Sequence, residues 1–378
     1  MIYLVSIFMF VVLLAALALF LIAAERFLLD YGICKVSVNA GERVLEVEGG
    51  QSLLEALNSQ EIYVPSACGG QGTCGYCKVT VLAGGGPVLP TELPYLARKD
   101  IRAGLRLACQ VKVRQDLDLR IPEEILNVRL YSATVESTRD LTYDTKEIRL
   151  RLLEPPEIAQ RPGQYVQIQA PSPAGPVWRA YSISSPVHEP NLVELVVRLV
   201  PGGIASTYLH NLKAGGPVTF TGPFGEFRLS EEPETEVVCV AGGCGLAPIK
   251  NIVETILARW PDRPTWLFFG CRTTRDVFYY EKFKRLAADH PSLRVVYALS
   301  DELEPGEKWD GETGFIHLSV DRFLEPGRKR QAFLCGPPVM VEAVQRVLED
   351  KGLAPKDIFF DDFGTGLPQG AAQAASTA

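Results

Sequence analysis

The sequence predicts a multidomain chain with a single N-terminal transmembrane helix, a small α+β domain, an antiparallel β-barrel and a doubly wound α/β domain. Three observations lead to this fold class. The first 24 residues carry no charged side chain. Short β-branched runs with glycine-rich loops then give way, near residue 127, to longer alternating strands. From residue 235 onward, apolar strands alternate with amphipathic helices. A chain of 378 residues is also too long for a single hydrophobic core, so two or three domains are expected.

The charge balance and the positions of the cysteines argue against a nucleic-acid-binding protein and against a disulfide-linked fold. The chain has 38 Lys and Arg side chains against 45 Asp and Glu, a net charge of −7, so it has no basic field to hold a nucleic acid. Of nine cysteines, four follow a tight pattern and five are scattered through apolar stretches. This usage favours a reducing, cytosolic environment over a disulfide framework. The five scattered cysteines are Cys34, Cys239, Cys244, Cys271 and Cys335.

The chain begins with an uncharged apolar segment from Met1 to Ala24. As a helix this segment would span about 36 Å, which is enough to cross a bilayer. A secretory signal is the alternative, but no basic region precedes the run, and the run exceeds the usual apolar core of about 7–15 residues. We predict a retained anchor over residues 1–24, a linker over 25–33, and the remaining domains on the cytoplasmic side of the inner membrane. The basic residues that favour this orientation are Arg26, Lys35 and Arg43.

The predicted α+β domain, residues 34–123, contains the tight cysteine pattern. Three cysteines share one glycine-rich loop, and the fourth stands alone before a later strand-like run. Four thiolates are what an iron–sulfur cluster requires, and the glycines let the loop turn sharply and aim backbone N–H groups at sulfur. A zinc ribbon would instead show two separated C-x2-C pairs, and an unliganded loop is the remaining alternative. The predicted ligands are Cys68, Cys74, Cys77 and Cys109.

The stretch from Lys35 to Ile121 resembles the plant-type and vertebrate-type ferredoxin family, with the five-residue first gap of the vertebrate type. The resemblance implies a β-grasp fold and a 2Fe-2S cluster. The domain carries about as many basic as acidic side chains, so it lacks the strong acidity with which ferredoxins dock many soluble partners. A tethered, dedicated electron donor is therefore expected.

The predicted barrel, residues 127–230, contains the motif Arg179-Ala-Tyr181-Ser182 and, further on, a glycine-rich turn and Gly222-Pro-Phe-Gly-Glu-Phe. Each is common in sheets and turns, but their order resembles the ferredoxin–NADP reductase family. The resemblance implies FAD, with Arg179 on the diphosphate, Tyr181 stacked on the isoalloxazine and Ser182 near its N5 atom. The turn would place a helix N-terminus against the diphosphate. Its predicted binding residues are Gly203, Ser206 and Thr207.

The last predicted domain, residues 235–364, opens with an apolar strand, a turn containing Gly243 and Gly245, and a helix. Strand, glycine turn and helix in this order bring backbone N–H groups to a dinucleotide diphosphate. In the reductase family, a later Cys-Gly-Pro-Pro segment orients the nicotinamide, which implies this role for Cys335 and Gly336. A terminal aromatic covers the flavin face in that family, and Phe363 matches it in position. Residues 365–378 are expected to be disordered.

The sequence favours NADH over NADPH. Ser300, Asp301 and Glu302 follow a predicted strand, where an acid would repel a 2′-phosphate and accept a hydrogen bond from a free ribose hydroxyl. Arg272 and Arg275 lie near enough in the sequence to leave NADPH open, because either guanidinium can bind a phosphate.

The order helix, ferredoxin, flavin barrel and nicotinamide domain is similar to that of the F subunits of sodium-translocating NADH:quinone reductases. The resemblance implies an enzyme that passes a hydride from NADH to FAD, and single electrons through the 2Fe-2S cluster to integral membrane subunits of a larger complex. A reductase component feeding a monooxygenase remains an alternative, as does a redox-sensing membrane module. The residues expected at the reaction centre are Ser182, Cys335 and Phe363.

Overall fold

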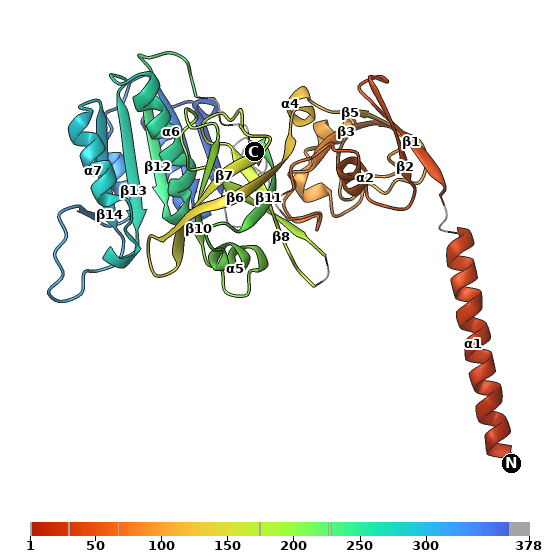
Figure 1. The fold of residues 1–378 in the computed structure, drawn as a ribbon. Helices are drawn as coiled ribbons and strands as arrows, with labels where there is room; N and C mark the ends of the chain where they lie inside the picture. The colour runs from red at the N-terminus through yellow and green to blue at the C-terminus, as the bar shows by residue number, and fades with distance from the viewer. Residues whose placement is uncertain are drawn as a thin grey trace. The chain divides into compact units, whose positions relative to one another are not determined.

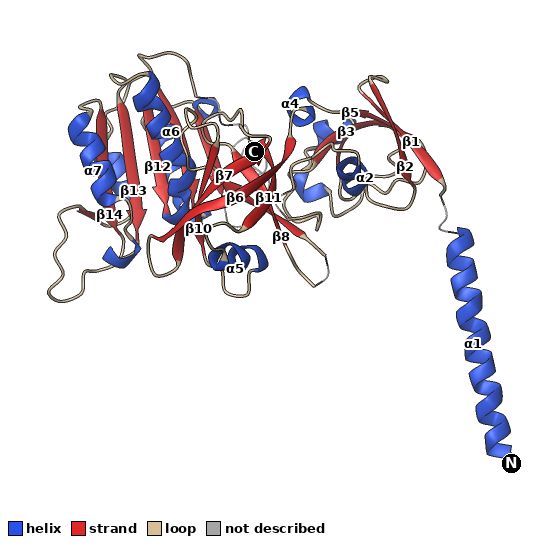
Figure 2. Cartoon of the chain, viewed as in Figure 1, coloured by secondary structure: helices blue, strands red, loops and turns tan. Residues whose placement is uncertain are grey.

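The computed structural model describes residues 2–28, 31–66, 68–173, 175–225, 227 and 229–362. Its contacts divide the chain into two compact units. The first consists of the chain up to Val64 together with Gly70–Leu126, and the second of Pro65–Gly69 together with the chain from Asn127 onward. Figure 1 labels the helices and strands, and Figure 2 distinguishes them by colour.

The N-terminal helix α1 spans Ile2–Leu28. Its large apolar side chains between Ile7 and Phe20 are mostly exposed, in contrast to the apolar side chains of the folded domains. Over the residues that the structure describes, no helix is long and apolar enough to cross a membrane. The predicted transmembrane span is therefore not confirmed.

The first unit contains a mixed five-stranded sheet in the order β2-β1-β5-β3-β4. β1 and β5 are parallel, and the other neighbours are antiparallel. α2 packs its buried leucines on this sheet, and a capping box between Ser52 and Glu55 fixes its start. The predicted α+β fold is confirmed. The elements are β1 (Ile33–Val38), β2 (Arg43–Glu48), α2 (Leu53–Ser59), β3 (Lys78–Ala83), a 3-10 turn (Leu93–Tyr95), α3 (Arg98–Arg102), β4 (Leu105–Leu107), β5 (Leu117–Arg120) and α4 (Glu123–Leu126).

The second unit begins with an antiparallel six-stranded sheet in the order β10-β7-β6-β11-β8-β9. Its two edge strands, β9 and β10, form no continuous ladder, although Ile183 and Ser184, directly after β9, pair with Leu195 and Glu194 of β10. The sheet is thus a half-barrel and not the fully laddered barrel that the strand pattern predicted. The elements are β6 (Arg129–Asp140), β7 (Thr145–Glu154), β8 (Tyr165–Ala170), β9 (Val177–Ser182), β10 (Leu192–Arg198), α5 (Ile204–Asn211) and β11 (Pro217–Phe224).

The rest of the second unit is a parallel six-stranded sheet in the order β15-β14-β13-β12-β16-β17, as the alternation of strands and helices predicted. α6 and α7 pack on one face and α8 and α9 on the other, so the central strands are buried on both sides. The elements are β12 (Glu236–Gly242), α6 (Leu246–Arg259), β13 (Thr265–Cys271), α7 (Tyr280–Asp289), β14 (Leu293–Leu299), β15 (Glu312–Thr313), α8 (Ile316–Phe323), β16 (Arg330–Gly336), α9 (Pro338–Asp350) and β17 (Ile358–Asp362), with 3-10 turns at Gly243–Gly245, Thr274–Asp276 and Pro355–Asp357.

Candidate functional site

The cysteine loop lies between α2 and β3 of the first unit. Cys77 is 1% exposed, and its sulfur lies 3.3 Å from the sulfur of buried Cys109. The Cys74 thiol is buried as well and lies close enough to raise the pKa of Cys77, after the larger effects of the Cys109 contact and burial. The structure therefore brings three of the four predicted ligands together. Cys68, which is half-buried, lies in Pro65–Gly69, the segment grouped with the second unit.

The backbone of this loop suits an iron–sulfur cluster. Gly69, Gly70, Gly72 and Gly75 all have positive φ angles, between 68° and 88°, a region that side-chain-bearing residues avoid. Within the described part of the chain, no group of three or more His, Cys, Asp or Glu side chains is placed to hold a single metal ion. Cys77 and Cys109 are near enough for both sulfurs to reach one iron, and thiolates are the ligands that Fe-S clusters take. The donor set thus fits a cluster.

The predicted flavin motif lies at the end of β9, an edge strand of the half-barrel. Ser182 is buried, whereas Arg179 and Tyr181 are partly exposed, and Nη1 of Arg179 donates to the carbonyl oxygens of Cys68 and Trp178 at 3.2 and 2.8 Å. Burial raises the pKa of Tyr181 to about 12; Arg179 opposes this shift and Cys244 adds to it. Tyr181 therefore stays a neutral phenol at physiological pH, and its ring presents an uncharged face. These residues fit an isoalloxazine and its diphosphate.

The predicted diphosphate turn precedes α5. Gly203 is the N-cap of this helix, and no side chain caps it, so its first backbone N–H groups are open to an anion. Ser206 is buried, and its hydroxyl accepts from the N–H of Val200 at 3.1 Å, which closes the turn. Thr207 is exposed. The sequence predicted the same FAD-binding role for both residues. In the structure, Ser206 closes the turn, whereas Thr207 is exposed.

The predicted nicotinamide residues meet where β12 and β16 run side by side. Gly243 has a φ of +55°, and a β-carbon on Gly245 would lie 2.0 Å from the carbonyl oxygen of Cys335. Gly336 has a φ of +155°, and a β-carbon there would lie 3.0 Å from the N atom of Gly242. The two glycine-containing segments therefore pack backbone against backbone, a closeness that side chains would prevent. α6 begins directly after the turn Gly243–Gly245, without a side-chain cap; we call this the nicotinamide turn because it packs against Cys335 and Gly336.

Buried polar side chains connect α6 with the strand that carries the flavin motif. Lys250 donates to the carbonyl oxygen of Ser184 at 3.0 Å and to the carboxylate of Glu194 at 2.9 Å. Asn251 donates to the carbonyl oxygen of Ser185 and, at 3.1 Å, to the side chain of Gln160. The start of α6 is thus fixed to the residues that follow Ser182. The nicotinamide turn and the flavin motif are thereby held in one arrangement.

The motifs in the sequence did not predict this connection. Lys250 is 1% exposed and Asn251 is fully buried, although both types usually lie at the surface. A signal was available, because these two polar residues interrupt the apolar face of α6 between Ile249 and Ile252. Burial opposes the charged form of Lys250, but Glu194 and Glu254 outweigh it and raise the lysine's pKa. Lys250 likewise lowers the pKa of Glu194 against the effect of burial.

A second polar group joins the half-barrel to α7. Tyr279, which has a φ of +57°, donates its hydroxyl hydrogen to Glu147 on β7. Arg139 pairs with the same carboxylate at 2.7 Å. Burial, together with Glu194 and Glu147, raises the pKa of Tyr279, so the hydroxyl remains a donor. This partly buried contact joins the half-barrel to the parallel-sheet domain in addition to the buried contacts of Lys250 and Asn251.

Two residues of the predicted cofactor-choice region form an ion pair. Arg272 lies 3.3 Å from Asp301, and both are at least partly exposed. A cavity of about 290 Å³ nearby is lined by Arg272, Arg275, Glu302 and other side chains from both sheets. Arg272 is thus already engaged by an acid, which favours a free ribose hydroxyl over a 2′-phosphate in this region.

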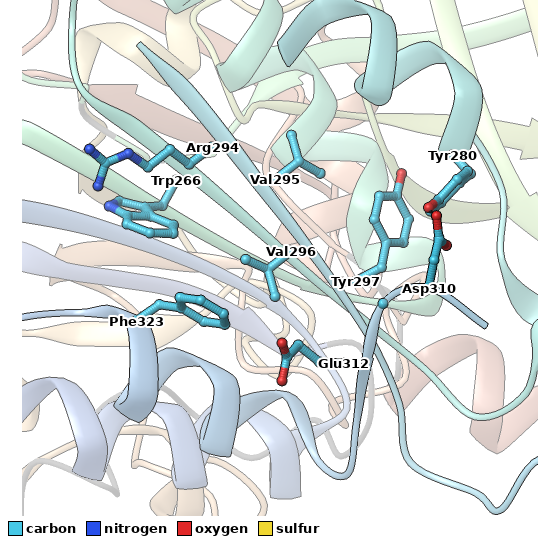
Figure 3. Close-up of a pocket in the computed structure, with 10 residues that line it drawn as sticks. Trp266, Tyr280, Arg294, Val295, Val296, Tyr297, Asp310, Glu312 and Phe323 are labelled. Carbon is cyan, nitrogen blue, oxygen red and sulfur yellow. Dashed lines mark hydrogen bonds between the residues drawn. The ribbon is translucent and has the colours of Figure 1, made fainter. Parts of the chain in front are cut away.

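A second cavity, of about 330 Å³, lies at the edge of the parallel sheet and contains none of the predicted site residues. Figure 3 shows Trp266 and Arg294 at one end and Tyr280, Tyr297 and Asp310 at the other. The Arg294 guanidinium stacks on Trp266 at 4.9 Å, and Tyr280 donates to Asp310 at 2.6 Å. Four of these side chains thus contact each other in pairs, and none of the predicted NADH-binding residues lines the cavity.

Phe363 and the predicted tail, residues 365–378, lie outside the described residues. β17 ends at Asp362, the residue before Phe363.

Comparison with known proteins agrees with this geometry. Residues 36–114 match a family described as 2Fe-2S iron-sulfur cluster binding domain, residues 132–229 match Oxidoreductase FAD-binding domain, and residues 239–346 match Oxidoreductase NAD-binding domain. The F subunit of the Na(+)-translocating NADH-quinone reductase of Neisseria gonorrhoeae is 37% identical over 95% of this chain and 98% of its own length. The chain belongs to the family of these F subunits. The relative from Klebsiella pneumoniae, with the same name, is 36% identical over 94% of this chain and 98% of its own length.

Solved structures resemble this family member over most of its length. The cytochrome P450 reductase GcoB of Amycolatopsis has a TM-score of 0.70 and 34% identity, covering 87% of this chain and 98% of that one. A ferredoxin reductase in carbazole 1,9a-dioxygenase has a TM-score of 0.66 and 30% identity, covering 88% and 99%. The chain is therefore an oxidoreductase of NADH, and the predicted cofactors NADH, FAD and a 2Fe-2S cluster are confirmed at the level of its domains.

Proposed function

We propose that the chain is the electron-input subunit of a membrane-bound, quinone-reducing complex, which oxidises NADH and delivers single electrons to integral membrane partners. The proposed domains are 34–123 for the cluster, 127–230 for FAD and 235–364 for NADH. The relatives named as F subunits of the Na(+)-translocating NADH-quinone reductase support this role, because they match 94–95% of the chain. Whether the complex transports sodium would depend on other subunits, since the proposed role of this chain ends with electron delivery.

The hydrogen bonds between α6 and the backbone after Ser182 give the strongest structural support for this proposal. The helix that begins at the nicotinamide turn is tied, through Lys250 and Asn251, to the backbone directly after Ser182. A hydride transfer requires the two reacting rings to be held in a fixed, close arrangement. Buried hydrogen bonds between the two motifs provide such a fixed arrangement.

The proposed residue roles are those that the family resemblance implies, and the positions of the described residues support them. Arg179 and the open N-terminus of α5 bind the FAD diphosphate, and Tyr181 and Ser182 position its ring. Gly243 and Gly245 let the NADH diphosphate approach the start of α6, and Cys335 and Gly336 orient the nicotinamide. Phe363 is proposed to shield the flavin face. The bound cofactors supply the chemistry, since flavin accepts a hydride and releases electrons singly, and an Fe-S cluster accepts one electron.

We propose Cys68, Cys74, Cys77 and Cys109 as the cluster ligands. The contact between Cys77 and Cys109, the buried Cys74 and the positive-φ glycines of the loop support this assignment. Cys68 is added from the sequence spacing.

We also propose that residues 1–24 anchor the chain in the inner membrane, with the other domains on the cytoplasmic side. The absence of charge over this segment and the exposure of its apolar side chains, such as Ile7, Phe8 and Phe20, support an apolar environment around α1. NADH is a cytoplasmic cofactor, which supports the proposed orientation.

The core activity is tested with the full chain in detergent, loaded with FAD and cluster. NADH should bleach the flavin band and then the cluster band, and should drive ferricyanide reduction. Cys109→Ser should keep NADH-dependent flavin bleaching and lose the cluster signal, because no proposed flavin-binding residue belongs to the cysteine loop. A fully loaded chain that neither bleaches nor reduces ferricyanide with NADH would contradict the proposal.

A reductase that feeds an oxygenase is the second candidate, favoured by the likeness to a cytochrome P450 reductase and to a reductase in a carbazole dioxygenase. Purification of the tagged full chain from its own membranes in mild detergent separates the candidates. Co-purifying integral membrane subunits with NADH:quinone activity would support the first, and a co-purifying oxygenase the second. Recovery of the active chain alone would favour the redox-sensing module.

A further inference from the structure

The side chain of Gln110 lies against Cys109, the proposed cluster ligand that stands apart from the cysteine loop. Its Nε2 atom lies 3.5 Å from the sulfur of Cys109, the residue before it in the chain. Its Oε1 atom accepts a hydrogen bond from the hydroxyl of Thr91 at 2.8 Å. The carboxamide of Gln110 therefore connects the fourth cysteine to the loop between β3 and α3.

The chemistry of the partners fixes which way the carboxamide points. A cysteine thiolate that binds metal can only accept hydrogen bonds, so the N–H side of the amide must face Cys109. The Oε1 atom then faces Thr91, whose hydroxyl can donate. The arrangement seen in the structure is the one that a thiolate requires.

The surroundings hold Gln110 in place. A β-carbon on Gly72, in the cysteine loop, would lie 2.6 Å from the Nε2 atom of Gln110, so the loop backbone packs directly on the amide. On the other side, Thr91 precedes Glu92, which is fully buried and pairs with Arg106 at 2.7 Å. Glu92 also accepts from the backbone N–H groups of Leu89 and Leu107 at 2.8 and 3.0 Å.

Arg106 makes further contacts with the segment that carries Thr91 and Glu92. Besides pairing with Glu92, it donates to the carbonyl oxygens of Gly85, Gly86 and Pro87 at 2.9–3.0 Å. These contacts tie the segment that carries Thr91 to strand β4 and to its own backbone. A donor held in this way loses little freedom when it forms a hydrogen bond with sulfur.

We propose that Gln110 is a positioning residue that sets the reduction potential of the cluster, by donating an N–H hydrogen bond to the Cys109 thiolate under the orientation imposed by Thr91. The inference rests on the proposed ligation of the cluster by Cys109. Reduction adds one negative charge to a cluster, and a hydrogen bond to a ligand sulfur stabilises the more negative state. Gln110 thus makes the cluster a better electron acceptor.

The test is a redox titration of the full chain in detergent, followed by visible absorbance and by the electron paramagnetic resonance of the reduced cluster. Gln110→Leu removes the hydrogen-bond donor and should lower the reduction potential of the cluster. We expect the ratio of reduced to oxidised cluster at a given applied potential to fall about tenfold, which corresponds to about 59 mV for one electron. Gln110→Glu keeps the size of the side chain but places a carboxylate beside sulfur, so it should lower the potential further and make it depend on pH. Thr91→Val should give a smaller shift of the same sign.

Gln115→Leu is the matched control, since Gln115 is an exposed glutamine whose amide donates at 3.3 Å to the carbonyl oxygen of Gly84 and not to sulfur. It should leave the potential unchanged. The inference is overturned if Gln110→Leu or the nearly isosteric Gln110→Glu retains the cluster at the wild-type potential. It is also overturned if the potential rises. A wild-type chain that assembles no 2Fe-2S cluster would instead overturn the proposed ligation, which keeps the two failures distinct.

Discussion

The Nζ atom of Lys250 lies 2.9 Å from the carboxylate of Glu194, and 1% and 4% of these two residues are exposed. Lys250 belongs to the helix that starts at the nicotinamide turn, and Glu194 belongs to strand β10 of the flavin half-barrel. A buried pair of this kind is costly to break, because the remaining charge has no water to solvate it. The pair therefore ties the two cofactor-binding parts of the second unit together.

Lys250→Met should destabilise the second unit by about 3–5 kcal/mol, because Glu194 and Glu254 would both lose the buried ammonium group that pairs with them. Chemical denaturation followed by tryptophan fluorescence measures this change. Lys282→Met provides the matched control, since Lys282 pairs with Glu254 but is 38% exposed, and it should cost less than about 1 kcal/mol. Equal costs for the two variants would show that the burial of Lys250 has no energetic role.

The pH dependence of the Lys250→Met deficit has a definite sign. In the wild type, Lys250 holds the pKa of Glu194 below its usual value. The stability that the ion pair contributes is therefore fully present above about pH 4.3, the pKa of Glu in the unfolded chain, and is lost as the pH falls through the lower pKa of the folded state. The melting-temperature difference between wild type and variant should therefore grow as the pH rises from 3 to 6, where the pair's contribution to stability appears. A difference that shrinks over this range would contradict the assignment.

Gly245→Ala should abolish NADH-dependent reduction, because the added methyl group would lie 2.0 Å from the carbonyl oxygen of Cys335 and push the two segments apart. FAD content and dithionite reduction of the flavin should remain, since the α5 turn is untouched. Gly215→Ala is the control, at a glycine in the half-barrel that has open space around it, and it should keep the NADH reaction. Full NADH activity in Gly245→Ala would show that the close packing is unnecessary.

Ser206→Ala and Thr207→Val should separate structure from binding in the FAD turn. The Ser206 hydroxyl accepts from the N–H of Val200 and so closes the turn. Removing this hydroxyl should lower the free energy of unfolding by about 1 kcal/mol even in the FAD-free chain. Thr207 is exposed, so its loss should weaken FAD binding and leave the FAD-free chain as stable as before. Melting curves and FAD titrations distinguish the two effects, and the reverse pattern would contradict these roles.

Asp301→Ala should increase the use of NADPH relative to NADH. The substitution releases the Arg272 guanidinium, which lies 3.3 Å from Asp301, to bind a 2′-phosphate. The ratio of kcat/KM for the two cofactors is the measurement, and it should move toward NADPH by about tenfold, equivalent to one charge-assisted hydrogen bond. The double variant Asp301→Ala, Arg272→Ala should lose this gain. An unchanged ratio in the single variant would exclude Asp301 from cofactor choice.

Local patterns in the sequence were sufficient for the secondary structure around each site. Alternating apolar strands predicted the antiparallel sheet, strands interleaved with amphipathic helices predicted the parallel sheet, and the cysteine spacing predicted the cluster domain, because burial periodicity and ligand spacing are short-range properties. The pattern predicted a full barrel, however, and the edge strands β9 and β10 form no continuous ladder. How far two edges separate depends on sheet curvature, which no single strand encodes.

The sequence by itself determined the three cofactor classes, since the cysteine loop, the Arg-x-Tyr-Ser strand and the glycine turns each carry their chemistry in a few adjacent residues. Only the tertiary structure decided which residues connect these sites. Lys250 and Glu194 are 56 positions apart, and Thr91 and Gln110 are 19 apart. Such pairs form when separate elements fold against one another, so the ion pair between the cofactor motifs and the hydrogen bond beside Cys109 depend on packing and leave no local pattern.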